Sequence, residues 1–101
     1  MPKAYWIAHV SVTNPDAYEK YRAANAAPFA RFGAKFVIRA GAQTVVEGTL
    51  RPRAVVIEFP NLQAATDCYN SPDYRAAMAL RQDASAADIC IIEGYDGEPG
   101  Q

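Results

Sequence analysis

The stretch formed by residues 53–60 constrains the fold of this chain more than any other, because it is apolar on both of its alternating faces. It is rich in β-branched and aromatic residues, which favours a β-strand, and Pro60 ends it. Alternation places Val55, Ile57 and Phe59 on one face and Ala54, Val56 and Glu58 on the other. A strand that is apolar on both faces must be covered on both. We therefore expect the chain's own helices to cover one face and a second copy of the chain to cover the other.

The length and composition indicate one globular domain. The chain has 101 residues, of which half are hydrophobic and 21% are charged. We expect a single domain over residues 1–95 and a flexible tail over residues 96–101, which are rich in glycine, proline and acidic residues. The formal net charge is −1 and the basic residues form no run, so neither a nucleic acid nor a membrane is predicted as a partner.

The two cysteines, Cys68 and Cys90, are far apart and belong to no metal-binding pattern. They are interpreted as small buried hydrophobic residues with free thiols. The sequence carries no signal-peptide pattern and no apolar run of membrane length, which predicts a cytoplasmic protein. Because the chain has one histidine, we expect no metal site, and no cofactor motif is found.

Hydrophobic periodicity and capping residues predict a regular succession of elements. They are a strand over residues 4–12, a helix over 15–32, strands over 35–40 and 53–60, a helix over 62–70 that restarts after Pro72, and a strand over 88–95. Asn14 and Pro15 are typical of the start of a helix. We expect Pro28 to kink the first helix or to separate its last turn.

The order βαββαβ predicts a ferredoxin-like fold of the α+β class, with a four-stranded antiparallel sheet and both helices on one face. The first strand then lies between the third and the fourth. The face without helices is still apolar, and an exposed apolar patch of this size usually marks an interface. Two such sheets packed face to face in a twofold dimer would bury it.

Several stretches, taken in order, resemble one known family. They are residues 5–10 (YWIAHV), 14–18 (NPDAY), 32–36 (FGAKF), 46–48 (VEG), 51–53 (RPR), 56–60 (VIEFP), 69–74 (YNSPDY) and 92–94 (IEG). Together they resemble the family called domain of unknown function 1330, within the dimeric α+β barrel superfamily. The resemblance implies a ferredoxin-like homodimer whose two sheets form a barrel. Relatives in the wider superfamily include cofactor-independent monooxygenases, dehydratases, muconolactone isomerases and stress-response proteins, a range that weakens any transfer of function. No motif of this sequence matches those enzymes, so no catalytic residue is carried over.

His9, in the middle of the first predicted strand, is the candidate catalytic residue. Its functional interpretation is a general acid or base that lines a cavity, with Glu58 or Glu93 as the neighbouring carboxylate. The structural alternative is a strand histidine that hydrogen-bonds a neighbour or lies at a wet dimer interface.

The candidate substrate-binding residues are polar groups within apolar segments, namely Asn25, Arg39, Glu58, Tyr69, Tyr74 and Arg81. Arg39 and Glu58 lie on adjacent predicted strands, so they form either an ion pair or part of a polar pocket in which Arg39 binds an anionic group. Asn25 interrupts the apolar stripe of the first helix and needs hydrogen-bond partners if it is buried. The tyrosines reach a cavity between helix and sheet or simply pack there.

Two functional hypotheses follow. The first is a small enzyme that works without a cofactor, in the manner of a monooxygenase or isomerase, on a small organic substrate. The second is a non-catalytic homodimeric module that binds a ligand or acts in stress responses. An enclosed pocket reached by His9 and another ionisable side chain would favour the enzyme. A sheet filled by aliphatic residues with every charge paired would favour the module.

Overall fold

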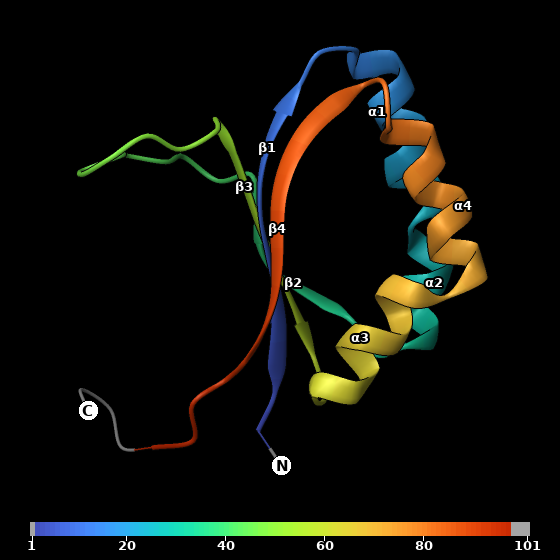
Figure 1. Ribbon diagram of the computed structural model, residues 1–101, viewed down its shortest axis with the longest axis vertical. Coiled ribbons are helices and arrows are strands. Elements are labelled where there is room, and N and C mark those ends of the chain that lie inside the picture. The colour runs from blue at the N-terminus through green and yellow to red at the C-terminus, as the bar shows by residue number, and fades with distance from the viewer. Residues whose placement is uncertain (1, 98–101) are drawn as a thin grey trace.

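The computed structural model, which describes residues 2–97, has two layers (Figure 1). A four-stranded antiparallel sheet forms one layer, and all four helices lie against one of its faces. The elements are β1 (Ala4–Val12), α1 (Pro15–Ala24), α2 (Ala26–Arg31), β2 (Lys35–Arg39), β3 (Arg53–Phe59), α3 (Leu62–Asn70), α4 (Pro72–Arg81) and β4 (Ser85–Glu93). The predicted ferredoxin-like fold is thus confirmed, with each predicted helix divided in two. Residues 94–97 form no helix or strand, and residues 98–101 of the predicted tail lie outside the described residues.

The strand order is β2-β3-β1-β4, so that β1 pairs with both β3 and β4. Trp6 lies opposite Ile57 in β3 and Ile91 in β4, on the face that the helices cover. The next residue, Ile7, lies opposite Val56 and Cys90 on the other face. The alternation expected from the sequence therefore sets which side chains of β1 and β3 face the helices.

The helices begin where the sequence provides a capping side chain. Asn14 accepts a hydrogen bond from the backbone of Ala17, and Asn61 and Ser71 accept the equivalent bonds at the starts of α3 and α4. The break between α1 and α2 lies at Asn25, one turn before Pro28. Proline cannot donate to the carbonyl four residues earlier, and its ring clashes with that group, so α1 ends there.

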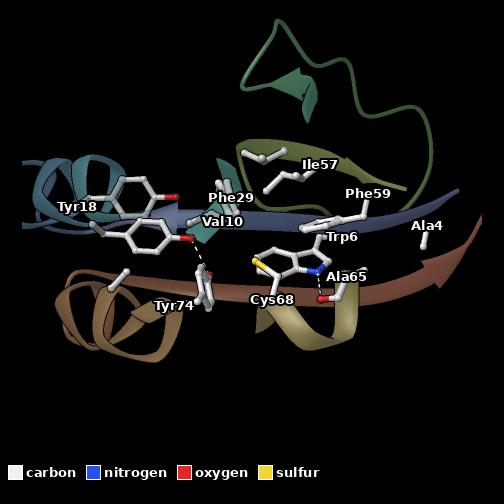
Figure 2. Packing of buried hydrophobic residues seen from close by; sticks show 13 residues of the cluster. Ala4, Trp6, Val10, Tyr18, Phe29, Ile57, Phe59, Ala65, Cys68 and Tyr74 are labelled. Atoms are coloured by element: carbon white, nitrogen blue, oxygen red, sulfur yellow. Dashed lines mark hydrogen bonds between the residues drawn. The ribbon is translucent and has the colours of Figure 1, made fainter. Parts of the chain in front are cut away.

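The core between the layers is an aromatic cluster around Trp6, whose exposed fraction is 2%. Its ring lies 4.9 Å from that of Tyr74 and 5.3 Å from that of Phe29, both in edge-on contact. The indole Nε1 donates a hydrogen bond of 2.9 Å to the carbonyl of Ala65 (Figure 2). Edge-on pairs of this kind stabilise a core beyond their buried area, and the hydrogen bond fixes the indole ring against α3.

Strand β2 contains a bulge between Phe36 and Ile38. Phe36 pairs with Ile57, and Arg39 pairs with Val55, so both face the helices although they are three residues apart. Regular alternation along residues 35–40 would place Phe36 and Arg39 on opposite faces, but the bulge adds one residue and reverses the alternation.

Strand β4 begins at Ser85, three residues earlier than predicted, because residues 85–87 already pair with the end of β1. The thiol-bearing Cys90 lies on the face without helices and is exposed in the single chain, whereas Cys68 is buried. The expectation of two buried cysteines is therefore wrong for Cys90. The register of β4 with β1 puts Cys90 opposite Ile7, on the face away from the core.

The sheet face without helices, called the open face below, is largely apolar. Ile38 in β2 and Ile92 in β4 are 47% and 51% exposed there. Ile7 in β1 and Val56 in β3 lie on the same face, on the two strands between β2 and β4. The loop between β2 and β3 projects away from the helices, on the same side as the open face (Figure 1). Val46 in this loop is 86% exposed. No helix among the described residues has the length and apolar character needed to cross a membrane.

Candidate functional site

A cavity lies between the sheet and the helix layer, and its lining comes from all four strands and from α1, α2 and α4. The space among the lining atoms, counted with its open mouth, is about 550 Å³, and the part that holds the centre of a water-sized molecule is about 40 Å³. The enclosed part of the cavity, called the slot below, is therefore small, and most of the space lies toward its mouth.

The slot exists because a small residue lies at the centre of the sheet. Ala8 in β1 lies opposite Val55 in β3 and Ile89 in β4, and all three face the helices. Larger side chains, Trp6 and Val10, flank Ala8 on the same face of β1. The helices rest on these larger neighbours, and the methyl group of Ala8 leaves the space between them unfilled.

Two tyrosines from different helices meet at one end of the slot. The hydroxyl oxygens of Tyr21 in α1 and Tyr74 in α4 are 2.8 Å apart, and Nη2 of Arg81 donates to the Tyr74 hydroxyl at 3.5 Å. Burial raises the pKa of Tyr74 far above that of an ordinary phenol, and the neighbouring Tyr21 adds to this while Arg81 opposes it. Burial likewise raises the pKa of Tyr18. The Tyr18 and Tyr74 hydroxyls therefore stay protonated at neutral pH and are available as hydrogen-bond donors.

Four arginines line the cavity, namely Arg22, Arg39, Arg53 and Arg81. Three of them lie over aromatic rings: Arg39 over Phe36 at 4.2 Å, Arg81 over Tyr21 at 5.2 Å and Arg53 over Tyr18 at 5.4 Å. Such stacking orients a guanidinium group without neutralising it.

The positive charge of the cavity is not balanced within its lining, because none of the lining residues found in the described range 2–97 is an aspartate, glutamate or histidine. Arg22 pairs with the exposed Glu19, but the salt bridges found among residues 2–97 do not include Arg39, Arg53 or Arg81. The Nε atoms of Arg22 and Arg53 are buried and make no hydrogen bond. The cavity is therefore cationic, and two of its arginines each have one buried donor without a partner. No group of three metal-ligating side chains occurs anywhere in residues 2–97.

The structure brings four of the predicted substrate-binding residues together at this cavity: Asn25, Arg39, Tyr74 and Arg81. Asn25 is only 6% exposed, and its side chain makes no capping bond to α2. It reaches the cavity because the break before Pro28 leaves it at the junction of α1 and α2. Arg39 reaches the mouth because the bulge in β2 turns it toward the helices.

His9 lies elsewhere, on the open face, where it is opposite Asp88 of β4. It lines a wide, open groove together with Ser11, Arg51 and the end of the loop between β2 and β3. Arg51 Nε donates to Asp88 at 2.9 Å, and its Nη1 donates to the Ser11 hydroxyl at 3.2 Å. The carboxylate beside His9 is thus Asp88 and not Glu58 or Glu93, because the register of β1 with β4 pairs these two positions.

Glu58 and Tyr69 are not at the cavity either. Glu58 lies on the open face, where it accepts a hydrogen bond of 3.3 Å from Tyr5 and pairs with Lys3 at 3.5 Å. The ion pair between Glu58 and Arg39, one of the two alternatives raised by the sequence, is absent from the described residues, because the bulge puts them on opposite faces of the sheet. Tyr69 packs edge-on against Trp6 within the core.

Sequence reasoning missed the cavity residues Arg22 and Arg53. A signal was present for both. Arg53 shares its strand face with Val55 and Ile57, and Arg22 lies one helical turn after Tyr18. Both signals are weak, because each arginine stands near the end of an element, where an arginine side chain is usually solvated.

A Tyr74→Phe substitution is expected to destabilise the fold by about 1–2 kcal/mol, because it leaves the buried Tyr21 hydroxyl without its partner. Tyr69→Phe is the matched control, since the Tyr69 hydroxyl makes no hydrogen bond within residues 2–97 and its ring also packs on Trp6. Urea unfolding of both variants measures the difference. Equal stabilities would show that the bond between the two tyrosines contributes nothing.

Comparison with known proteins places the chain among small proteins of the same fold. A family profile described as "Domain of unknown function (DUF1330)" matches residues 3–95. A protein of unknown function from Rhodopseudomonas palustris is similar in structure, with a TM-score of 0.76 and 18% identity over 95% of this chain and 85% of that one. No curated protein gives a significant match.

Two further solved structures are similar at lower scores. SnoaB, a cofactor-independent oxygenase from Streptomyces nogalater, has a TM-score of 0.63 and 17% identity, covering 98% of this chain and 99% of its own. A dimeric protein of unknown function with a ferredoxin-like fold, from Bacteroides fragilis, has a TM-score of 0.61 and 14% identity, covering 91% and 96%. At these identities the likeness concerns the fold alone.

Proposed function

The chain belongs to the family described as "Domain of unknown function (DUF1330)", and since that description assigns no activity, we propose a function from the cavity itself: the protein binds a small organic molecule between its sheet and its helices. The observation that carries this proposal is the convergence of Asn25, Arg39, Tyr74 and Arg81 on one slot with an aromatic wall. An apolar pocket with a few convergent polar groups is the usual form of a small-molecule site.

We also propose that the protein acts as a homodimer through its open face. The apolar surface around Val56, Ile38 and Ile92 supports this, because a stable monomer rarely exposes a contiguous apolar patch. The dimeric ferredoxin-like protein from Bacteroides fragilis has the same fold. In such a dimer Cys90 and His9 would be covered, and the loop between β2 and β3 would extend beside the partner.

A cofactor-independent enzyme is the second candidate. The hydroxyls of Tyr21 and Tyr74 with Arg81 form a set of donors that could stabilise negative charge developing on a substrate oxygen. The fold neighbour SnoaB is a cofactor-independent oxygenase. Because the lining has no histidine or carboxylate, such an enzyme would act on substrates acidic enough to ionise without a strong base. The decisive measurement is turnover of a bound compound by the purified protein with no cofactor added, under air and under nitrogen.

Filling the slot tests the binding proposal. Ala8→Leu is expected to abolish ligand binding, because its side chain occupies the space above the centre of the sheet, while the melting temperature stays within a few degrees. The control is Ala79→Leu on the exposed side of α4. A library of small organic molecules is screened by thermal shift, since a ligand that binds only the folded state raises its stability. Undiminished binding by Ala8→Leu would place the ligand elsewhere.

The catalytic role of His9 stays a prediction, and it can be separated from the cavity. We expect His9→Gln to leave cavity binding unchanged, because its side chain lies on the other face of the sheet. The same thermal-shift ligands are titrated against the variant. A loss of affinity of about tenfold or more would mean that the open-face groove and the cavity act together.

A further inference from the structure

Resting on the proposed function, we propose that the ligand of this cavity is a small organic anion, with a flat, largely apolar body and one carboxylate or similarly acidic group. The basis is a cationic slot in which two buried guanidinium donors lack a partner and an aromatic wall lies close by.

The charge of the slot is the first step. Arg39, Arg53 and Arg81 line it without a salt bridge in the described part of the chain, and no acidic side chain lies in its lining. Grouping like charges beside a low-dielectric core is costly, and the cost falls when an opposite charge enters. The chain as a whole carries a net charge of −1, so it contains acidic residues, yet none of them in residues 2–97 lies in the lining of the slot.

The unused donors are the second step. Nε of Arg22 and Nε of Arg53 are buried without a hydrogen-bond partner. Because these two atoms have almost no exposed surface, water does not satisfy them in the empty protein, and a buried donor without a partner is costly. An acceptor that enters as these arginine side chains shift would remove this cost, whereas a neutral apolar ligand would not. A carboxylate supplies acceptors and charge together, and guanidinium groups match its geometry.

The body of the ligand follows from the aromatic part of the lining. Trp6, Phe29 and Phe36 line the slot, and Ala8 gives it its depth. The two phenyl rings have no hydrogen-bond donor, and the indole Nε1 of Trp6 already donates to Ala65, so these rings offer no donor for a second anionic group. Aromatic side chains favour a planar ring against them, and the small enclosed volume favours a compact body. An inorganic anion would satisfy the arginines but would leave this wall unused.

The test uses matched pairs of acids and amides: benzoate with benzamide, phenylacetate with phenylacetamide, and 2-naphthoate with 2-naphthamide. Each pair shares one body and differs in charge at neutral pH. Trp6 is the single tryptophan of the chain and lines the cavity, so its fluorescence reports occupancy there. We expect at least one acid to bind about tenfold more tightly than its amide. Inorganic phosphate is titrated in parallel.

Arg53→Gln is expected to remove most of this preference while the variant still melts cooperatively, and Arg53→Lys to restore part of it. Arg75→Gln is the matched control, because Arg75 is exposed on α4 and lies outside the cavity lining. It makes the same change of charge and should keep the full preference. Loss of the preference in both variants would show a general surface effect and overturn the proposal.

The remaining outcomes separate the two proposals. If acids and amides bind the natural protein equally well, the charge class is wrong while the cavity remains a small-molecule site. If phosphate binds as tightly as the acids, the site selects inorganic anions and the organic body is wrong. If no member of any pair changes the fluorescence of Trp6 or the melting temperature at millimolar concentration, both the anion proposal and the proposed function are overturned.

Discussion

An Ile57→Asp variant is expected to be unfolded or insoluble. Ile57 is 5% exposed and lies at the centre of β3, where it faces the helices and pairs with Trp6 in β1 and Phe36 in β2. Removing a buried isoleucine side chain costs about 2–5 kcal/mol, and the carboxylate adds the penalty of a buried charge without a partner. Domains of this size have total stabilities of about 5–15 kcal/mol, so little or nothing remains.

The measurement is circular dichroism with thermal melting of the purified variant. Val56→Asp is the control for the strand itself. It places the same charge on the adjacent residue of β3, whose side chain points to the open face and not to the helices. A soluble Ile57→Asp protein with an unchanged melting temperature would mean that the helices do not cover β3 as described.

Val56→Asp is expected to give a folded monomer. Val56 lies opposite Ile7 and Ile38 at the centre of the open face, where two sheets of a dimer would meet. In a twofold dimer each interface would receive two like charges in an apolar setting, and such unpaired buried charges cost several kcal/mol. In the single chain the side chain is half-buried and the added charge reaches water, so the fold survives.

Light scattering coupled to gel filtration measures the outcome, with the natural protein expected as a dimer at micromolar concentration. Leu80→Asp is the matched control, because Leu80 is exposed on α4, on the side of the molecule away from the open face. It should remain dimeric. A dimer formed by Val56→Asp would locate the interface elsewhere, and a monomeric natural protein would contradict the dimer altogether.

The sequence predicted the fold well because its signals are local. Asn14 starts a helix as expected, Asn61 starts another in the same way, and Gly33 ends one with a positive φ of 73°, a conformation that glycine adopts without strain. The alternation of Ala4–Val12 fixed the two faces of β1. These features depend on side chains a few residues apart, so a pattern in the chain is enough to predict them.

The candidate site was predicted less well because it depends on register between distant segments. Asn25, Tyr74 and Arg81 come from helices some fifty residues apart in the chain and meet only when both helices pack on one sheet face. His9 was grouped with them although alternation already separated it from Trp6. What the pattern left open is which face the helices cover, and therefore on which face a cavity forms.

What the sequence by itself determined is the order of the elements, their caps and the two apolar faces of the central strand, since periodicity and capping are properties of neighbouring residues. What only the tertiary structure decided is the cationic slot. A single bulge turned Arg39 from the face of Glu58 to that of Phe36, and the packing of the helix layer on the sheet brought the guanidinium group of Arg53 over the ring of Tyr18. Both arrangements depend on contacts between segments far apart in the chain. In a paired strand, one added residue reverses the direction of every side chain beyond it.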